Sequence, residues 1–415
     1  MGSEVVEHRL ESICLLVVDC PHATPKWTDA GVVVLRNQNI KGGRLDLSSP
    51  SYTDEVHYLG RTKRAVPQAG DIVITREAPM GDVCQIPAGL KCCLGQRQVL
   101  LRPDPKKVDS RFLLYALQSP YIQNQIGWNE GTGSTVSNLR IPVLEALSVP
   151  TPELAVQREV AETLGAIDDR ITLLRETNTT LEAIAQALFK SWFVDFDPVH
   201  AKMQGRAPEG MDDATAALFP DSFEESELGS VPKGWTLGKL ADIASLKGGK
   251  MLDKASFAES GEHPVFGGAG VMGYSDFFNA EGFVITVGRV GAYCGQYFWH
   301  QGKAWVNNNA SLVSPSNLNH ACWLFLWLKS VDMDLIKKGA AQPFVSNGDI
   351  ADLKIVLPPS QVIDKFVQSI DPIFKKLSSI TAQSKSLEVL RDTLLPRLIS
   401  GRLPFESNMS ERAHV

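Results

Sequence analysis

The feature that most constrains this chain is an internal repeat with a period of about half its 415 residues. Residues 70–85 (GDIVITREAPMGDVCQ) match residues 281–296 (EGFVITVGRVGAYCGQ) through an apolar run, an arginine, a glycine turn and a second apolar run. Residues 135–152 match residues 344–360 through a shared Val-Ser-Asn, a short apolar segment and a proline stop. Each half continues into a long helical pattern. The sequence therefore predicts a pseudo-twofold molecule of two similar mixed α/β domains, each followed by a helix.

The first helical pattern has the period of a coiled coil. Its seam follows a four-three spacing, a period of 3.5 residues that lasts for about four heptads. The seam positions are Val160, Leu164, Ile167, Ile171, Leu174, Asn178, Leu181, Ala185 and Leu188. Thr151 as N-cap, Pro152 as first helical residue and Glu153 mark the predicted start. About 37 residues would form a rod of roughly 55 Å; an amphipathic helix docked on a globular core is the alternative.

The second helical pattern is less regular. Its apolar positions are Ile363, Val367, Ile370, Phe374 and Leu377, then Leu387, Leu390, Leu394 and Leu398 after a polar patch at Thr381 and Ser384. Pro372 predicts a kink or a restart. Asn178 and Ser384 occupy equivalent positions, and a polar seam residue can fix register. Residues 151–200 carry 4 basic and 9 acidic side chains and residues 359–415 carry 8 and 6, which favours an antiparallel pair of coiled-coil-like helices.

These patterns divide the chain into six segments. The predicted segments are a first α/β domain (1–150), a first long helix (151–197), an acidic linker (198–232), a second α/β domain (233–358), a second long helix (359–403) and a tail (404–415). The linker is rich in Pro, Gly and acidic residues, and we expect a short helix at residues 212–218.

The acidic charge of the chain lies outside the predicted domains. The net charge is -6, but residues 1–150 carry 16 basic and 15 acidic side chains, and residues 231–358 carry 11 and 10. Because the acidity belongs to one helix and one linker, the net charge argues only weakly against a nucleic-acid partner.

Cysteine usage and hydropathy favour a cytoplasmic protein. The seven cysteines form no Cys-x-x-Cys pair and have no histidine at ligand spacing, so we expect free buried thiols and no metal. The longest apolar runs are too short for a membrane span, and the first residues do not resemble a secretory signal.

Motifs for catalysis are weak. A Gly-x-Gly-x-x-Gly string at residues 268–273 has the wrong context for a dinucleotide site, because no helical pattern follows it, and we interpret it as a turn. The sequence contains no P-loop, no His-Glu-x-x-His and no Gly-x-Ser-x-Gly. We expect a binding protein, with a nuclease that uses an unrecognised metal site as the alternative from the enzyme class.

Several strings resemble the specificity subunits of type I restriction and modification systems. They are LEAIAQALFKSWFVDFDP at residues 181–198, LLPRLISGRL at residues 394–403, GDIVITR at residues 70–76 and Gly234-Trp235. The resemblance implies a non-catalytic subunit whose two domains each recognise one half of a split, asymmetric double-stranded DNA target. It also implies partners: two methyltransferase subunits and a restriction and translocase subunit, which would hold S-adenosylmethionine, ATP and magnesium. A freestanding DNA-binding regulator or scaffold is the alternative.

Polar residues at matched places in the two halves are the candidates for DNA binding. Arginine suits guanine, asparagine and glutamine suit adenine, and lysine and hydroxyl groups suit phosphate. The candidates are Arg76, Lys91, Arg97, Gln98, Thr132, Ser134, Ser137 and Asn138 in the first half, and Arg289, Lys303, Asn307, Asn308, Asn309, Gln342, Ser346 and Asn347 in the second. The alternative roles are structural: a turn for the asparagines and an ion pair for Arg76.

The ends of both helices carry more apolar surface than a two-helix seam requires. The residues concerned are Leu188, Phe189, Trp192, Phe193, Leu394, Leu395 and Leu398. We interpret them as a docking face for the methyltransferase subunits, with burial against the chain's own domains as the alternative.

Overall fold

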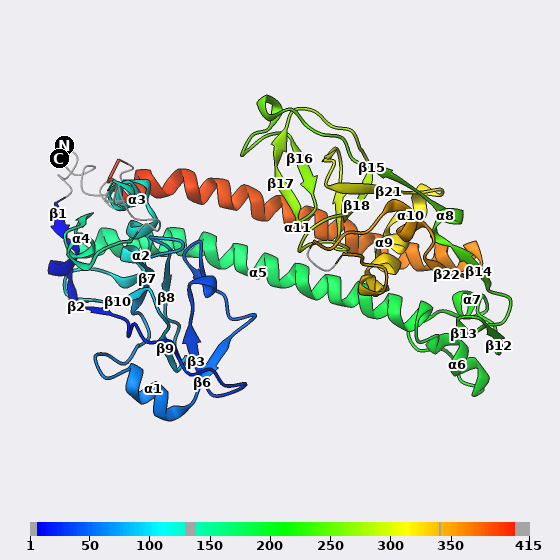
Figure 1. Cartoon of the computed structure of the whole chain (residues 1–415), viewed down its shortest axis with the longest axis horizontal. Helices are drawn as coiled ribbons and strands as arrows, with labels where there is room; N and C mark the ends of the chain where they lie inside the picture. Colours follow the sequence, from blue (N-terminus) through cyan, green and yellow to red (C-terminus); the bar gives the residue numbers. More distant parts are fainter. Residues whose placement is uncertain (1–5, 129–137, 340–341, 403–415) are drawn as a thin grey trace, which may run out of the picture. The chain divides into compact units, whose positions relative to one another are not determined.

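The computed structural model describes residues 6–128, 138–339 and 342–402 of the chain (Figure 1). The chain forms two compact units. Unit 1 consists of Met1–Leu173 with Ser384–Val415, and unit 2 consists of Leu174–Gln383. Both long helices are divided between the units, so each unit contains one part of each helix.

Unit 1 is built on a four-stranded antiparallel sheet with the order β2-β10-β7-β8. These strands are β2 (Cys14–Asp19), β10 (Gln98–Pro103), β7 (Ile72–Thr75) and β8 (Val83–Gln85). In a second sheet, β3 (Val32–Leu35) pairs antiparallel with β6 (Ser51–Thr53) and parallel with β9 (Cys92–Leu94). The remaining pairs are β1 (Glu7–Arg9) with β11 (Ser148–Pro150) and β4 (Ile40–Lys41) with β5 (Arg44–Leu45).

Among its described residues, unit 1 also has six short helices. They are η1 (Leu10–Ile13), η2 (Asn37–Asn39), α1 (Glu55–Arg61), α2 (Ser110–Gln118), α3 (Pro120–Gly127) and α4 (Ile141–Glu145). Asp109 begins α2, because its carboxylate accepts the backbone N–H groups of Arg111 and Phe112. Phe112 is fully buried in a core that combines strands β7 and β10 with α2 and the ends of α5 and α11.

Unit 2 repeats this construction. Its four-stranded sheet has the order β15-β21-β18-β19, and its second sheet has the order β17-β16-β20 with one antiparallel and one parallel pairing. The strands are β15 (Ala244–Gly248), β21 (Ala310–Pro315), β18 (Phe283–Gly288), β19 (Tyr297–Gln301), β17 (Gly270–Ser275), β16 (His263–Gly267) and β20 (Trp305–Val306). A further pair joins β14 (Thr236–Lys239) to β22 (Lys354–Leu357). The same strand order in both units confirms the repeat that the sequence predicts.

Two short helices of unit 2 lie at the start of the predicted linker or within it. The full set is α6 (Asp197–Met203), α7 (Asp213–Ala216), α8 (Leu240–Ile243), η3 (Lys254–Ser256), η4 (Leu318–His320), α9 (Ala321–Ser330), η5 (Met333–Leu335) and α10 (Asn347–Ala351). The α7 helix lies within residues 212–218, where a short helix is predicted, and β12 (Phe223–Ser226) forms a hairpin with β13 (Gly229–Pro232). The linker segment therefore carries regular structure.

The two long helices are α5 (Leu154–Phe193) and α11 (Ser360–Ile399), each 40 residues long. The α5 helix begins two residues after the predicted first position, Pro152, because Thr151 extends the β1–β11 pairing instead of capping the helix. Its N–H donates to the carbonyl of Val6 at 2.8 Å, and its hydroxyl donates to the same carbonyl at 3.1 Å. The helix α11 runs through Pro372 without a restart.

The helices run antiparallel in each unit. In unit 1, Asp168 of α5 pairs with Arg391 of α11. In unit 2, Asn178 Nδ2 donates to Thr381 Oγ1 at 3.1 Å, and Phe189 packs on Phe366. From Asp168 to Phe189 the residue numbers of the contacts increase along α5, while those of their partners decrease along α11 from Arg391 to Phe366. This confirms the long paired helices.

The predicted seam of α11 is wrong at Leu390, whose side chain is 45% exposed. Fully buried Phe366, which is not among the predicted seam positions, packs with Phe189, Trp192 and Phe193. Tertiary packing within unit 2 therefore overrides the heptad pattern at Phe366, whereas Leu390 belongs to unit 1 and stays partly exposed there.

The glycine-rich string of unit 2 is a turn. Gly268 and Ala269 form the turn between β16 and β17, which confirms the interpretation of the string.

All seven cysteines are free, and six are buried. Burial raises the pKa of Cys84 and of Cys92 to about 12, as expected for unreactive thiols. Within the described residues, no helix combines the length and apolarity that a bilayer crossing needs.

Candidate nucleic-acid interface

Arg76 follows β7 and is held inside unit 1. Its Nη1 donates to both carboxylate oxygens of Asp19, at 2.9 and 3.0 Å, and its Nε donates to the carbonyl of Leu139 at 2.9 Å. Nη2 lies 3.3 Å from Oδ1 of Asn138. The Arg76 side chain is 12% exposed. These contacts give Arg76 and Asn138 the structural role weighed against DNA binding.

The other candidates of unit 1 differ in exposure. Lys91 is 54% exposed and pairs with Glu55 at 2.7 Å, and its Nζ lies 4.8 Å from the ring centroid of Tyr58. Arg97 is 57% exposed, pairs with Glu77 at 3.2 Å and has a positive φ of 64°. Because exposed pairs of this kind are weak, both cations can exchange their partner for a phosphate.

Gln98 is fully buried, although it was predicted to contact DNA. Its Oε1 accepts the backbone N–H of Gly95 at 3.1 Å, and its Nε2 donates to Oδ1 of Asn37 at 3.2 Å. A base edge cannot reach this amide without a rearrangement of β10. Thr132, Ser134 and Ser137 lie outside the described residues.

Arg289 follows β18 at the position of unit 2 that corresponds to Arg76. Its backbone N–H donates to the carbonyl of Asn309 at 3.1 Å, and its own carbonyl accepts the N–H of Val345 at 3.0 Å. Its Nε is buried and has no hydrogen-bond partner among the described residues. The guanidinium of Arg289 is therefore less constrained than that of Arg76.

The three consecutive asparagine candidates of unit 2 form one loop. Asn308 and Asn309 are exposed, whereas Oδ1 of Asn307 accepts the N–H of Asn308 at 2.7 Å and shapes the turn. Lys303 is exposed, with its Nζ 4.4 Å from the ring centroid of Phe278. Asn307, Asn308 and Asn309 lie directly between β20 and β21.

The last three candidates lie before and at α10. Gln342 is exposed. Ser346 caps α10, because its Oγ accepts the N–H of Asp349 at 3.1 Å. Asn347 Oδ1 accepts the hydroxyl of Ser311. Ser346 and Asn347 thus have structural contacts, and Gln342 stays a candidate by exposure.

The two asparagines of the shared Val-Ser-Asn strings do not occupy equivalent positions in the two units. Leu139 donates its N–H to the carbonyl of Arg76, and Val345 makes the same contact with Arg289. Leu139 therefore corresponds to Val345, and Asn138 corresponds to Phe344 rather than to Asn347. The repeat is real, but this part of the sequence match is shifted by three residues.

The proposed docking residues are part of the two cores. Phe189 and Trp192 are 2% and 8% exposed; in unit 2 both pack against Phe366, and Trp192 also packs against Phe219. The remaining residues lie in or against the cores of their units: Leu188 and Phe193 in unit 2, and Leu394, Leu395 and Leu398 in unit 1. Burial within the chain accounts for their positions, and a docking role for these residues stays a prediction.

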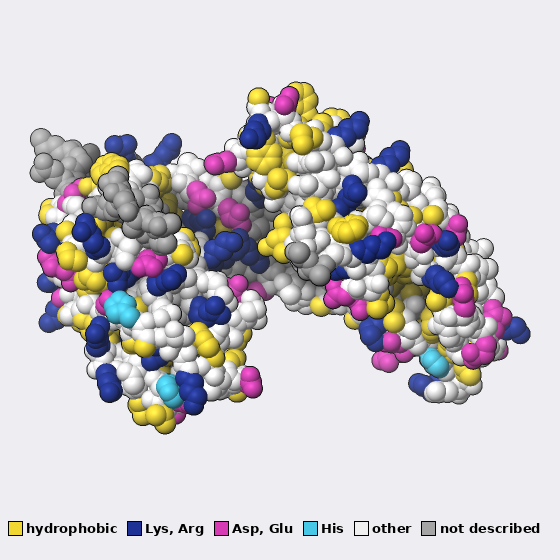
Figure 2. Space-filling view, viewed as in Figure 1, with side chains coloured by type: hydrophobic (Ala, Val, Ile, Leu, Met, Phe, Trp, Pro, Cys, Tyr) yellow, Lys and Arg dark blue, Asp and Glu magenta, His cyan; other side chains and the backbone are white. Residues whose placement is uncertain are grey.

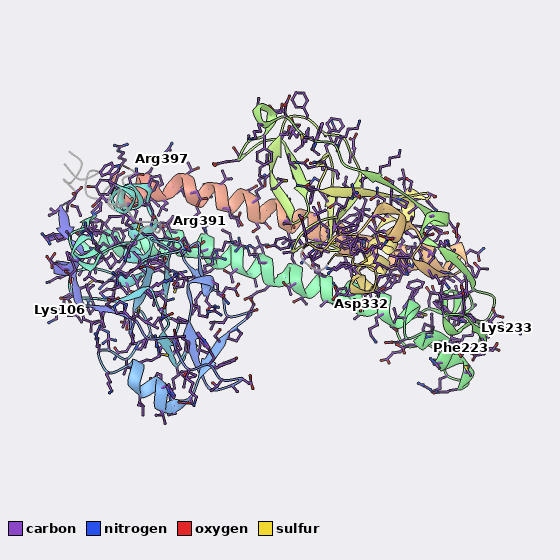
Figure 3. The ribbon with its side chains drawn as sticks, in the orientation of Figure 1. Lys106, Phe223, Lys233, Asp332, Arg391 and Arg397 are labelled. Atoms are coloured by element: carbon purple, nitrogen blue, oxygen red, sulfur yellow. The ribbon has the colours of Figure 1, made fainter. Side chains whose placement is uncertain are left out.

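A cluster around Asp168 in unit 1 was missed from the sequence. Its Oδ1 accepts Nη2 of Arg44 and Nη1 of Arg391, each at 2.9 Å, and its Oδ2 accepts the hydroxyl of Tyr115 at 2.8 Å. Burial alone would raise the pKa of Asp168, but hydrogen bonds from Arg391 and Tyr115 outweigh it and lower the pKa. Arg391 is labelled on α11 in Figure 3.

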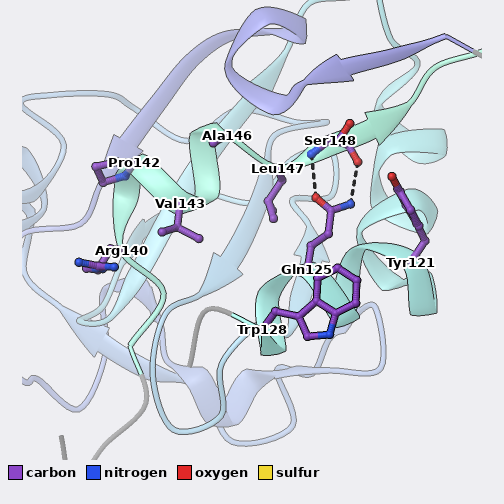
Figure 4. A pocket seen from close by; sticks show the side chains of 9 residues that line it. All are labelled: Tyr121, Gln125, Trp128, Arg140, Pro142, Val143, Ala146, Leu147 and Ser148. Carbon is purple, nitrogen blue, oxygen red and sulfur yellow. Dashed lines mark hydrogen bonds between the residues drawn. The ribbon is translucent and has the colours of Figure 1, made fainter. Parts of the chain in front are cut away.

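Two exposed apolar surfaces were also missed. Figure 4 shows a pocket of unit 1 between α3 and α4, where Gln125 exchanges two hydrogen bonds with the backbone of Ser148 and Trp128 is 81% exposed. In unit 2, Val271 and Phe277 are 50% and 57% exposed, and Figure 2 shows hydrophobic side chains gathered over β16 and β17. The surface of unit 2 belongs to no repeated string. The pocket of unit 1 is lined partly by residues 140–148 of the second repeated string, but a match between two strings does not show which residues line a pocket.

Comparison with known proteins agrees with this architecture. A family model described as the type I restriction modification DNA specificity domain matches residues 23–183 and 232–389. The MjaIX specificity subunit, a type I restriction enzyme component of Methanocaldococcus jannaschii, is 26% identical over 363 residues, which cover 81% of this chain and 78% of the relative. The HindI specificity subunit of Haemophilus influenzae is 27% identical over 342 residues, covering 66% and 73% of the two chains.

The fold itself has a solved relative. The crystal structure of a type I restriction-modification S subunit from M. genitalium matches with a TM-score of 0.54 and 20% identity, and 95% of each chain is covered. The present chain belongs to the family of type I restriction modification DNA specificity domains and carries that domain twice. It is a non-catalytic DNA specificity subunit, and the alternative of a freestanding regulator is not favoured.

Proposed function

We propose that each unit recognises one half of a split, asymmetric duplex target. The observation that carries this proposal is the repeated strand order with different residues at corresponding positions. Ala310 corresponds to Gln98, and Asn309 corresponds to Arg97, because each pair occupies the same place relative to its paired strands. Two similar frames with different side chains favour two different half-sites in one target.

The long helices are proposed to set the spacing of the half-sites. The chain passes from unit 1 to unit 2 within α5, and 40 residues of helix span roughly 60 Å. If helix length limits the separation, the half-site centres lie no farther apart than about 18 base pairs at roughly 3.4 Å each.

The partners follow from the same proposal. The MjaIX and HindI relatives are named as specificity subunits of type I restriction enzymes, and we infer that this chain directs two methyltransferase subunits and a restriction and translocase subunit to its target. Those subunits would bind S-adenosylmethionine, ATP and magnesium, and this chain would bind no cofactor. We expect the assembly to act in the cytoplasm, where its DNA substrate lies.

Copurification tests the assembly. We expect the tagged full-length chain, coexpressed with the methyltransferase subunit, to retain that subunit and to direct methylation of a defined sequence. A chain that stays alone beside the methyltransferase would contradict the proposal. Cleavage of DNA by the purified chain with magnesium alone would instead support the nuclease alternative.

A further inference from the structure

Strand register makes Arg76 and Arg289 equivalent. On the central strand of unit 1, Gln98 pairs with Thr75, and on that of unit 2, Ala310 pairs with Gly288. The next residue after each paired position on β7 and β18 is an arginine. Both arginines donate their backbone N–H to the corresponding residue before the central strand, Arg97 or Asn309.

The same register shows that the acidic partner is missing in unit 2. Val99, one residue into the central strand of unit 1, pairs with Asp19, which binds Arg76. The equivalent Ser311 pairs with Gly248. A Cβ built on Gly248 would lie 3.4 Å from Nη1 of Arg289, so a side chain here would meet the guanidinium directly. Gly248 therefore stands where unit 1 places the carboxylate.

Arg289 is left with unmet hydrogen-bonding capacity. A guanidinium has five N–H donors, and Arg76 uses Asp19, Leu139 and Asn138 as acceptors. Among the described residues, Arg289 has no acidic partner, and its buried Nε has no acceptor. Arg289 as a whole is half-buried, and its terminal N–H groups are not among the buried atoms without a partner, so these groups can bind an acceptor supplied from outside.

The surroundings of Arg289 suit DNA. Val290, the next residue after Arg289, forms an isolated antiparallel β-bridge with Phe344, and the two are 39% and 43% exposed. Asn309, whose carbonyl accepts the backbone N–H of Arg289, is also exposed. A guanidinium with neighbouring amide and apolar groups can contact base edges and phosphates, both of which offer paired acceptors.

We propose that Arg289 contacts DNA directly, through paired acceptors that its guanidinium binds in place of the missing carboxylate, whereas Arg76 is a structural residue. The inference rests on the proposed function of the chain. It makes the two units unequal at one equivalent position: Asp19 occupies the arginine of unit 1, and the target occupies the arginine of unit 2.

The sharpest test restores the missing acid. In the full chain, Gly248→Asp should pair with Arg289 as Asp19 pairs with Arg76, and Gly248→Ala is the matched control without a carboxylate. The probe is a duplex that carries the target sequence obtained from the methylated adenines of the host genome. We expect Gly248→Asp and Arg289→Gln to weaken binding at least about tenfold, the loss expected for one bidentate contact, and Gly248→Ala to bind within about twofold of wild type.

The outcomes separate the possible acceptors. If Arg289 binds a guanine, Arg289→Gln loses discrimination at one base pair of one half-site. If it binds a phosphate, the substitution weakens binding to all sequences alike, and the slope of log K against log salt concentration falls in magnitude by about one. Thermal unfolding of each variant checks the fold. Wild-type affinity in both Gly248→Asp and a folded Arg289→Gln would overturn the inference, and a wild-type chain without sequence preference would instead refute the proposed function.

Discussion

Asp168 joins three separate stretches of unit 1 through one carboxylate. Arg44 comes from β5, Tyr115 from α2 and Arg391 from α11, and the Asp168 side chain is 17% exposed. Removing one member of a buried ion pair leaves the others charged and unpaired, which typically costs about 3–5 kcal/mol.

Asp168→Ala should therefore lower the free energy of unfolding of the chain by about 3 kcal/mol. The neighbouring Asp169 provides the control, because it is 70% exposed and pairs with Arg111 on the surface. We expect Asp169→Ala to change stability by less than about 1 kcal/mol. Urea unfolding of both variants measures the difference, and equal losses would refute the importance of the Asp168 cluster.

The lowered pKa of Asp168 also predicts a pH dependence. Because its pKa is lower in the folded than in the unfolded chain, its contribution is present above the unfolded value and is lost as pH falls through the folded value. Stability should decrease on acidification below about pH 5, and Asp168→Asn should flatten this dependence. Melting temperatures of both proteins from pH 7 to pH 3 test this, and parallel curves would contradict it.

At the residue scale, the sequence predicts residue types better than residue surroundings. The arginines that follow β7 and β18 are visible in the repeat, but the carboxylate that binds Arg76 is far away in sequence, because Asp19 lies 57 positions before it. Gln98 begins a strand with four more buried residues, so no alternation of polar and apolar residues marks its burial. The difference between Arg76 and Arg289 becomes visible only from the strand pairing, which places Asp19 beside Arg76 and Gly248 beside Arg289.

At the element scale, the heptad pattern of α5 predicts the helix and its buried positions well. Val160, Leu164 and Ile171 are fully buried. The pattern fails where other contacts compete: Thr151 joins a strand pairing instead of the helix, and Leu390 is exposed. Local periodicity cannot show which face the surrounding domain covers.

Asn178 provides a prediction for the paired helices. Its Oδ1 is buried without a hydrogen-bond partner among the described residues, and its Nδ2 donates to Thr381. Asn178→Leu removes the unsatisfied group, and we expect the stability to rise by about 1 kcal/mol. Thermal unfolding measures this change. A lower melting temperature would show that the bond to Thr381 outweighs the unpaired oxygen.

At the scale of the whole molecule, the repeat is the strongest signal in the sequence. It predicts two domains of one topology, and the strand orders β2-β10-β7-β8 and β15-β21-β18-β19 confirm it. The bases recognised could not be predicted, because the exposed candidate side chains lie on loops whose conformation is set by tertiary packing.

The proposed role of the helices as a spacer predicts an effect of their length. One heptad inserted into α5 beside Asn178 and another into α11 beside Ser384 would keep the helices paired and lengthen them by about 10 Å. We expect the gap between the half-sites to grow by about three base pairs. Insertion into α5 alone is the control, because it breaks the pairing and should abolish recognition; an unchanged gap in the double insertion would rule out the helices as the spacer.

A genome-wide map of N6-methyladenine in cells with and without this chain tests the central claim most directly. Two units that recognise different half-sites predict one methylated target, made of two specified segments of unlike sequence separated by a fixed number of unspecified base pairs. Methylation that depends on the chain but lies in a continuous or palindromic sequence, or methylation that persists unchanged without the chain, would contradict the account.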